Sequence, residues 1–311
     1  MALTYDQVSA ITHALINESI ADNIYASNPL FMWLFEKGKV VEDGGLHIQL
    51  PIDYKAIGAV GTFSKYSILD TTPTDNFTAA KWLWKYYYGQ VIVSDTELWE
   101  NSGKSQAVNL LKSKTRSAMM SLKDTLGTDA FSTNGDSSLG LNGLRQTVKA
   151  SGLAGGIDSA DFAGWAANID SSTANLTLAT MDTLFLNCSV GSEEPDIIVT
   201  HKNEFAKYRA LLQANQRFGA SEVGAGNFRY LLFNSVPMFH DSHCPGAGAT
   251  KHMFMLNSNW VYLYANKNCN FKVEKIGKIP SQAVYVDRIV FGGNIATDNR
   301  RLLGAFTVLN D

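Results

Sequence analysis

Imidazole, carboxylate and thiol groups are gathered most densely at residues 238–246, MFHDSHCPG. His240, Asp241, His243 and Cys244 lie within five consecutive positions of this segment. Such groups are the usual ligands of transition metals and the usual nucleophiles and bases of hydrolases. The segment therefore suggests one hypothesis, a metal-dependent or cysteine enzyme that uses His240, His243 and Cys244.

The surrounding sequence argues against this hypothesis. The cluster follows an apolar run that ends near Phe239 and is typical of a strand, whereas ligands four residues apart converge on a helix. No second cluster supplies a fourth ligand, and the sequence has no GxxxxGKS/T, GxSxG, HExxH or paired CxxC motif. We interpret residues 240–246 as a turn between two strands, with Pro245 and Gly246 reversing the chain. We expect no enzymatic activity and no cofactor.

Composition excludes several other classes of protein. The chain has 311 residues and a net charge of −3, so it lacks the general basic surface of proteins that grip nucleic acid. No apolar run approaches the ~18 residues of a membrane span, and we expect no membrane association. The three cysteines are too widely spaced to indicate a disulfide framework. Sixteen Phe, twelve Tyr and six Trp suffice for a large core and leave aromatic residues for interfaces.

The rest of the sequence predicts the helices and strands that position this cluster. Residues 4–20 predict a short helix, and Phe31, Trp33 and Phe35 predict an arm that docks on the body. Residues 44–97 alternate between apolar and polar positions, which predicts a long β-hairpin with a polar tip. In its second half, one face is expected to carry Trp82, Trp84, Tyr86 and Tyr88. A hairpin of this length needs a surface to lie on, either its own domain or another subunit.

A long helix is predicted from Lys104 to about Phe131, because this stretch has no proline and carries an apolar stripe at steps of three or four residues. The stripe consists of Val108, Leu111, Thr115, Ala118, Leu122 and Leu126. At ~1.5 Å per residue the helix would be about 40 Å long. A turn-rich break at 132–143 precedes a segment with alternating helix and strand patterns, and strands dominate from residue 252 onwards.

This order of elements resembles the major capsid proteins of tailed double-stranded DNA phages. Three local segments strengthen the resemblance: GGIDSADFAGWAANI, EPDIIVTHKNEFAKYRALLQANQRF and NSVPMFHDSHCPGAGATKHMFMLNSNWVYLYA. The first is similar to the Gly-Ile-Asp segment that precedes the apical domain in many of these proteins. The second is similar to their strand-then-helix segment, in which a Pro-Asp pair leads the strand. The third is similar to their Val-Pro strand, which is followed by a turn and a strand ending in Leu-Asn. Ser159 departs from this pattern, because relatives often have arginine there.

The resemblance implies an α+β fold of the Hong-Kong-97 type. Its parts would be an N-terminal arm (1–43), an extended β-hairpin loop (44–97), a peripheral domain built around a spine helix (98–150 and 263–311) and an α/β axial domain (151–262).

The resemblance also implies a function. The protein would be a major capsid protein that assembles through hexamers and pentamers into the icosahedral shell of a phage head, and it would lie in the virion after assembly in the host cytoplasm. Its partners would be other copies of itself, a scaffolding protein, a portal, decoration proteins and packaged double-stranded DNA bound without sequence specificity. An encapsulin-type compartment is the alternative with the same fold.

The hairpin would then lie across a neighbouring subunit. Contact residues expected in the extended loop are Lys65, Tyr66, Leu69, Asp70, Phe77, Trp82, Trp84, Tyr86 and Tyr88. Contacts of the arm are expected from Phe31, Trp33 and Phe35. If His240 and His243 face a neighbour, their protonation below about pH 6.5 would place positive charge at a subunit contact.

Overall fold

The fold was obtained as a computed structural model. It describes residues 28–53, 58–72, 75–100, 104–171, 176–213, 222–223, 229–246, 251–280 and 282–307. The helix expected at residues 4–20 lies outside these ranges.

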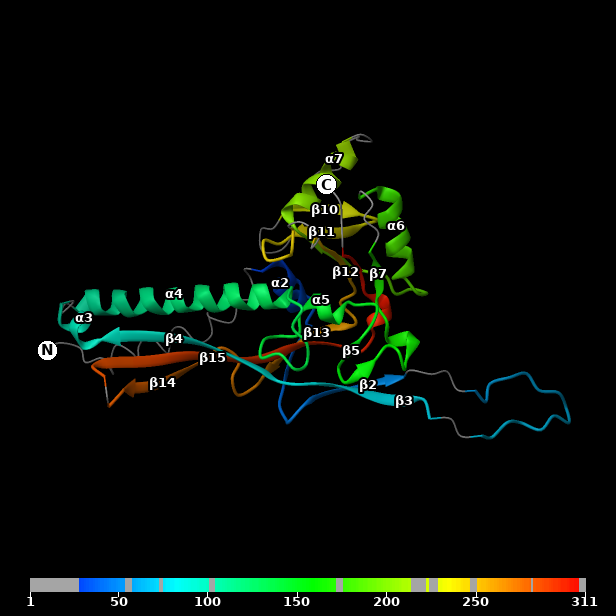
Figure 1. Cartoon of the computed structure of the whole chain (residues 1–311), viewed down its shortest axis with the longest axis horizontal. Coiled ribbons are helices and arrows are strands. Elements are labelled where there is room, and N and C mark those ends of the chain that lie inside the picture. The colour runs from blue at the N-terminus through cyan, green and yellow to red at the C-terminus, as the bar shows by residue number, and fades with distance from the viewer. Residues whose placement is uncertain are drawn as a thin grey trace.

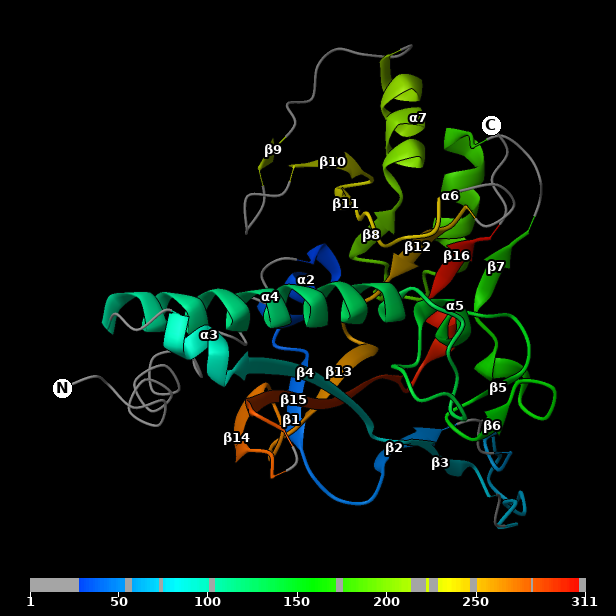
Figure 2. The same cartoon turned by 60° about the vertical axis from the view of Figure 1, so that its left-hand side comes forward.

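One half of the molecule is an elongated five-stranded sheet. It contains β1 (Val40–Asp43), β13 (Val261–Asn266), β15 (Val284–Thr297), β14 (Lys272–Lys278) and β4 (Lys85–Ser94). β15 is antiparallel to β13, β14 and β4, whereas β1 runs parallel to β13. Helix α3 (Asp95–Glu100) turns the chain back, and helix α4 (Lys104–Ala130) then runs along β4 (Figures 1 and 2).

The long helix α4 confirms the prediction made from its periodicity. Its 27 residues correspond to a length of about 40 Å. Leu111, Thr115, Leu122 and Leu126 are buried, so the predicted stripe is the face that packs on the body. Burial of these side chains stabilises a helix that is far longer than an average one.

The other half is a seven-stranded mixed sheet in the order β7, β16, β12, β8, β11, β10, β9. Helices α6 (Leu178–Asn187) and α7 (Lys202–Gln213) pack against it (Figure 1). The strands are β7 (Asn168–Asp170), β16 (Gly304–Phe306), β12 (Met253–Leu256), β8 (Ile197–Thr200), β11 (Val236–His240), β10 (Arg229–Phe233) and β9 (Glu222–Val223). All four residues of β8 and of β12 are buried, as expected for central strands covered on both faces.

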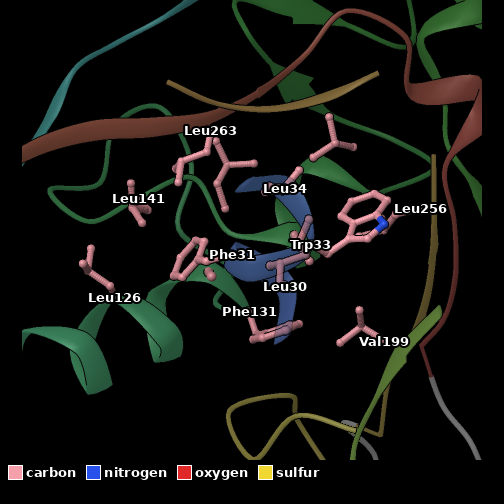
Figure 3. Close-up of a cluster of buried hydrophobic side chains, with 14 of the residues drawn as sticks. Leu30, Phe31, Trp33, Leu34, Leu126, Phe131, Leu141, Val199, Leu256 and Leu263 are labelled. Carbon is pink, nitrogen blue, oxygen red and sulfur yellow. The ribbon is translucent and has the colours of Figure 1, made fainter. Parts of the chain in front are cut away.

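A shared core joins the two sheets (Figure 3). Helix α2 (Pro29–Glu36) contributes Leu30, Phe31, Trp33 and Leu34 to it. The Asn28 side chain caps this helix by accepting a hydrogen bond from the Leu30 N–H. The same core contains Leu126 and Phe131 from the α4 region, Val199 and Leu256 from the seven-stranded sheet, and Leu263 from the five-stranded sheet.

The β-hairpin is shorter than predicted. β2 (Ile48–Asp53) pairs with β3 (Phe77–Trp82) over six residues, and the chain then breaks at Leu83 and Trp84 before β4 begins. From Lys85 onwards the strand pairs with β15 instead of β2. The second half of the expected hairpin is therefore part of the five-stranded sheet.

This change of partner reverses which side chains point inwards. Trp82 has 0% exposure and Trp84 is also buried, whereas Tyr86 and Tyr88 are exposed. The prediction that these four residues share one face is wrong, because the break at 83–84 shifts the alternation by one position.

The described chain also contains several short elements. They are α5 (Leu144–Thr147), the small hairpin of β5 (Leu153–Ala154) and β6 (Ile157–Asp158), and the 3-10 turns η1 (Ala163–Trp165) and η4 (Arg300–Leu302). Gly155 and Gly156 form the tight turn of the small hairpin, and both have positive φ. A Cβ on Gly155 would lie 2.9 Å from the Ala80 Cβ and from Trp82, so this glycine permits close contact with the base of β2–β3.

Candidate assembly surfaces

Residues 58–72, the tip of the predicted hairpin, form the extended loop of the described structure. This loop is its most prominent exposed feature. It projects from the end of β2 and β3, away from the rest of the chain (Figure 1). It carries five large, exposed apolar side chains: Val60, Phe63, Tyr66, Ile68 and Leu69. Ile68 is 99% exposed. Exposed apolar side chains gathered in one segment are typical of an interaction site.

The tip of the extended loop has local hydrogen bonds. The Ser67 N–H donates to the Ser64 carbonyl at 3.0 Å, and the Ser64 N–H donates to the Ser67 hydroxyl at 2.9 Å. The Asp70 carboxylate accepts from the Thr72 hydroxyl at 2.6 Å, and this bond lowers the pKa of Asp70. The Lys65 ammonium lies 5.9 Å from the centre of the Tyr66 ring. The tip therefore has a defined turn although no other described helix or strand packs on it.

A second exposed surface lies on β4. Tyr86, Tyr88 and Ile92 point outwards from this strand, and Tyr88 is 69% exposed. Phe77, at the start of β3, is exposed as well.

Trp82 and Trp84 need a correction, because they do not lie on either exposed surface. Both belong to a core cluster with Ile157 and Trp165, and the Trp84 Nε1–H donates to the Gly45 carbonyl at 3.0 Å. They fix the base of the loop to the body and are not available for contacts with a neighbour in this conformation.

The aromatic residues of the arm divide in the same way. Phe31 and Trp33 are buried in the shared core, and Phe35 is about half exposed on the outer side of α2. Only Phe35 of these three could contact a neighbouring molecule in this conformation.

His243 links the turn after β11 to helix α4. Its Nδ1 lies 3.0 Å from the Asp241 carboxylate, and its Nε2 lies 3.0 Å from the Asp124 carboxylate. Asp241 is 1% exposed, and it also accepts the His243 backbone N–H at 2.9 Å. Hydrogen bonding to Asp241, and then to Asp124, raises the pKa of His243 to about 9. The imidazolium is therefore favoured at neutral pH, and it bridges two acidic side chains.

Gly127 allows this arrangement. It is an interior glycine of α4, and a Cβ there would lie 2.8 Å from the His243 ring. The imidazole therefore lies directly on the helix backbone, at a position where any larger residue would displace it.

The side chains of the enzyme hypothesis, those of His240, His243 and Cys244, lie in different environments. Cys244 is buried in the shared core, and burial raises the pKa of its thiol well above the ordinary value, which disfavours the nucleophilic thiolate. His240 is exposed beside Phe205, with ring centres 5.2 Å apart. Within the described residues, no three His, Cys, Asp or Glu side chains are grouped closely enough to hold a metal ion.

Comparison with known proteins identifies the fold. No protein-family model and no curated protein matches the sequence. The structure, however, matches a subunit of the capsid of cyanophage A-1(L) with a TM-score of 0.70 and 15% identity, over 90% of this chain and 92% of the other. The chain has the Hong-Kong-97-type capsid fold. The predicted fold class is thus confirmed.

Two further structures share this capsid fold. The capsid of a native GTA particle matches with a TM-score of 0.62 and 12% identity, over 87% of this chain and 88% of the other. The SrpI encapsulin complex from Synechococcus elongatus PCC 7942 matches with a TM-score of 0.57 and 12% identity, over 89% of this chain and 87% of the other.

Sequence reasoning missed some residues of these surfaces. Val60, Phe63 and Ile68 belong to the exposed set of the extended loop, and their signal was three large apolar residues in a segment rich in Gly, Ser and Thr. Asp124 carries no local signal, because it meets His243 only through the fold.

Proposed function

We propose that this protein is the major capsid protein of a tailed phage, which self-assembles into an icosahedral shell around double-stranded DNA. The observation that carries the proposal is the extended loop, whose five exposed apolar side chains are covered by no other part of the described chain. Water contact at so many large apolar groups is unfavourable, and a neighbouring subunit would remove it. The chain has the fold of a protein found in a phage capsid, where such a neighbour is available.

The phage shell is favoured over an encapsulin compartment by the comparisons. The cyanophage capsid has a TM-score of 0.70 and the encapsulin one of 0.57. The net charge of −3 is compatible with a shell that encloses DNA without binding it tightly, since strong phosphate binding requires many basic groups. Within the described residues, no helix combines the length and apolar character needed to cross a membrane.

The parts of the chain take the following roles under this proposal. Residues 1–43 form the arm, and the segment 44–97 contains both the loop that reaches a neighbour and strand β4, which returns to the five-stranded sheet. Residues 98–150 with 263–311 complete the peripheral domain, and residues 151–262 form the axial domain, whose sheet also includes β16. Copies of the chain form hexamers and pentamers. A scaffolding protein, a portal and decoration proteins are the further partners, and assembly takes place in the host cytoplasm before the shell becomes part of the virion.

Electron microscopy of the purified protein tests the proposal. We expect closed shells of uniform size, and nuclease-resistant DNA inside particles made during infection. Deleting residues 66–76 should leave the subunit folded and abolish shells, because the apolar groups of the tip are lost. Leu139→Ser is a matched control, since it removes an exposed apolar side chain far from the loop in sequence and should not affect assembly. Normal shells from the deletion variant, or a uniform population of monomers from the wild type, would contradict the proposal.

A further inference from the structure

A cavity lies at the base of the extended loop, where β2 and β3 meet the small hairpin of β5 and β6 (Figure 1). The Lys81 N–H of β3 donates to the Gly155 carbonyl at 2.8 Å, and this bond joins the loop base to the small hairpin. The walls of the cavity come from β2, β3, β6, η1, Trp260 and the segment 298–301. Its volume of about 350 Å³ lies within the usual range for small-ligand sites.

Three aromatic side chains, those of Phe162, Trp165 and Trp260, line the cavity. The Trp165 indole N–H donates to the Ala154 carbonyl at 3.1 Å, and the Trp260 indole N–H donates to the Glu193 carboxylate at 3.3 Å. Both indole N–H groups are therefore satisfied within the chain. The rings offer a ligand carbon and π surface, but no further hydrogen-bond donor.

Asp298 places an acidic group in this cavity. Its Oδ1 is buried, and no hydrogen bond within the described chain reaches that oxygen. Burial raises the pKa of Asp298 to about 6. Its own backbone N–H, the charge of Lys39 and the Tyr262 hydroxyl act in the opposite direction, but burial outweighs them. At neutral pH the carboxylate is therefore mostly ionised and incompletely compensated.

The other charged residues near the cavity do not compensate this carboxylate. Asp53 and Arg301 also line the cavity, but both are exposed and their charges are opposite. The guanidinium of Arg300 is buried and donates to two backbone carbonyls, and Arg300 does not line the cavity. The least solvated charge of the cavity is thus that of Asp298, and a bound cation would neutralise it.

We infer that this cavity is a binding site for an organic cation, namely a primary ammonium or guanidinium group on an aliphatic stem. The stem would lie against the aromatic walls, and the cation would pair with Asp298 beside the rings of Phe162 and Trp260. A ligand here would touch β2 and η1 together, so it would hold the base of the extended loop against the body. The cation belongs either to a free amine or to a Lys or Arg side chain of a second copy of this chain.

Binding to the unassembled subunit tests the site. At neutral pH, n-butylamine and ethylguanidine should raise the melting temperature and shift the NMR signals of the Trp165 and Trp260 indole N–H groups. 1-Butanol has the same stem without the charge and should bind at least tenfold more weakly. Equal binding of butylamine and butanol would overturn the inference.

Two variants test the role of the carboxylate. Asp298→Asn keeps the shape of the side chain and should weaken butylamine binding at least tenfold. Asp161→Asn is the matched control, because Asp161 is an exposed carboxylate next to Phe162 that does not line the cavity, and this variant should bind as the wild type does. Unchanged binding by Asp298→Asn would refute the site.

Purified shells distinguish the two sources of the cation. A free amine should be released on denaturation in about one copy per subunit, and a cryo-electron microscopy map should show isolated density beside Asp298. A side chain should appear instead as density continuous with another subunit, with no amine released. A cavity that is empty in shells and releases no amine would overturn the inference. This comparison rests on the proposed shell function, whereas the measurements on the unassembled subunit do not, so the two can fail separately.

Discussion

The ionic contact of His243 should make subunit stability depend on pH. In the folded chain its imidazolium is held between Asp241 on its own turn and Asp124 on α4. These contacts raise the pKa of His243 from 6.5 to about 9. A raised pKa means that folding favours the protonated form, so the stabilisation is complete below pH 6.5 and is lost as the pH rises through about 9.

The magnitude follows from the same pKa. Each pKa unit corresponds to about 1.4 kcal/mol, so the full difference amounts to about 3 kcal/mol. Asp124 is 79% exposed, and solvent screening weakens its share of the contact. We therefore expect a loss of about 2 kcal/mol in the free energy of unfolding between about pH 6 and about pH 10.

Urea unfolding of the unassembled subunit at these two pH values measures the effect. The variant His243→Gln cannot form the imidazolium and should lack this component of the pH dependence. His47→Gln is the control, because His47 is an exposed residue before β2 and its replacement should leave the wild-type dependence unchanged. If His243→Gln loses as much stability with rising pH as the wild type, the bridge does not stabilise the fold and the reasoning is refuted.

Four further substitutions, in three predictions, test packing and burial. Gly127→Ala should lower the free energy of unfolding by about 1–3 kcal/mol in urea, because the new Cβ would lie 2.8 Å from the His243 ring. This loss should outweigh the higher helix propensity of alanine, and a stabilised variant would contradict the contact. Trp82→Ala should cost about 3–5 kcal/mol of unfolding free energy, whereas Tyr88→Ala should change it by less than about 0.5 kcal/mol, and equal losses would contradict their different burial. Burial raises the pKa of Asp298 to about 6, so above this pH the ionised carboxylate destabilises the folded state. Asp298→Asn should therefore raise the melting temperature at about pH 8 but not at about pH 4, and a gain at both would point to another cause.

Local patterns were sufficient to predict the elements whose stability is local. The helix from Lys104 follows from a continuous apolar stripe without proline, and its observed end at Ala130 agrees with the prediction. The turn after β11 was also expected, since polar residues with Pro245 and Gly246 favour a reversal whatever surrounds them.

Partners that are distant in sequence determine which side chains of residues 82–88 are buried and what His243 contacts, and the local pattern does not specify these partners. The aromatic alternation at 82–88 looks continuous in sequence, but the chain exchanges β2 for β15 at Leu83 and Trp84, and this exchange reverses the buried face. The same holds for His243, because its partner Asp124 is 119 residues away along the chain. A pattern of residue types indicates which side chains prefer burial or charge, but the fold selects their partners.

The length of β15 has a mechanical consequence. β15 and β4 are joined over ten residue pairs, and their hydrogen bonds lie perpendicular to both strands. Tension that pulls the two strands in opposite directions along their axes loads these bonds in shear, so they share the force and must fail together. A force that peels β4 away from one end would break them one after another. The subunit should therefore resist stretching along the long axis of α4 much better than lifting of β4 out of the sheet.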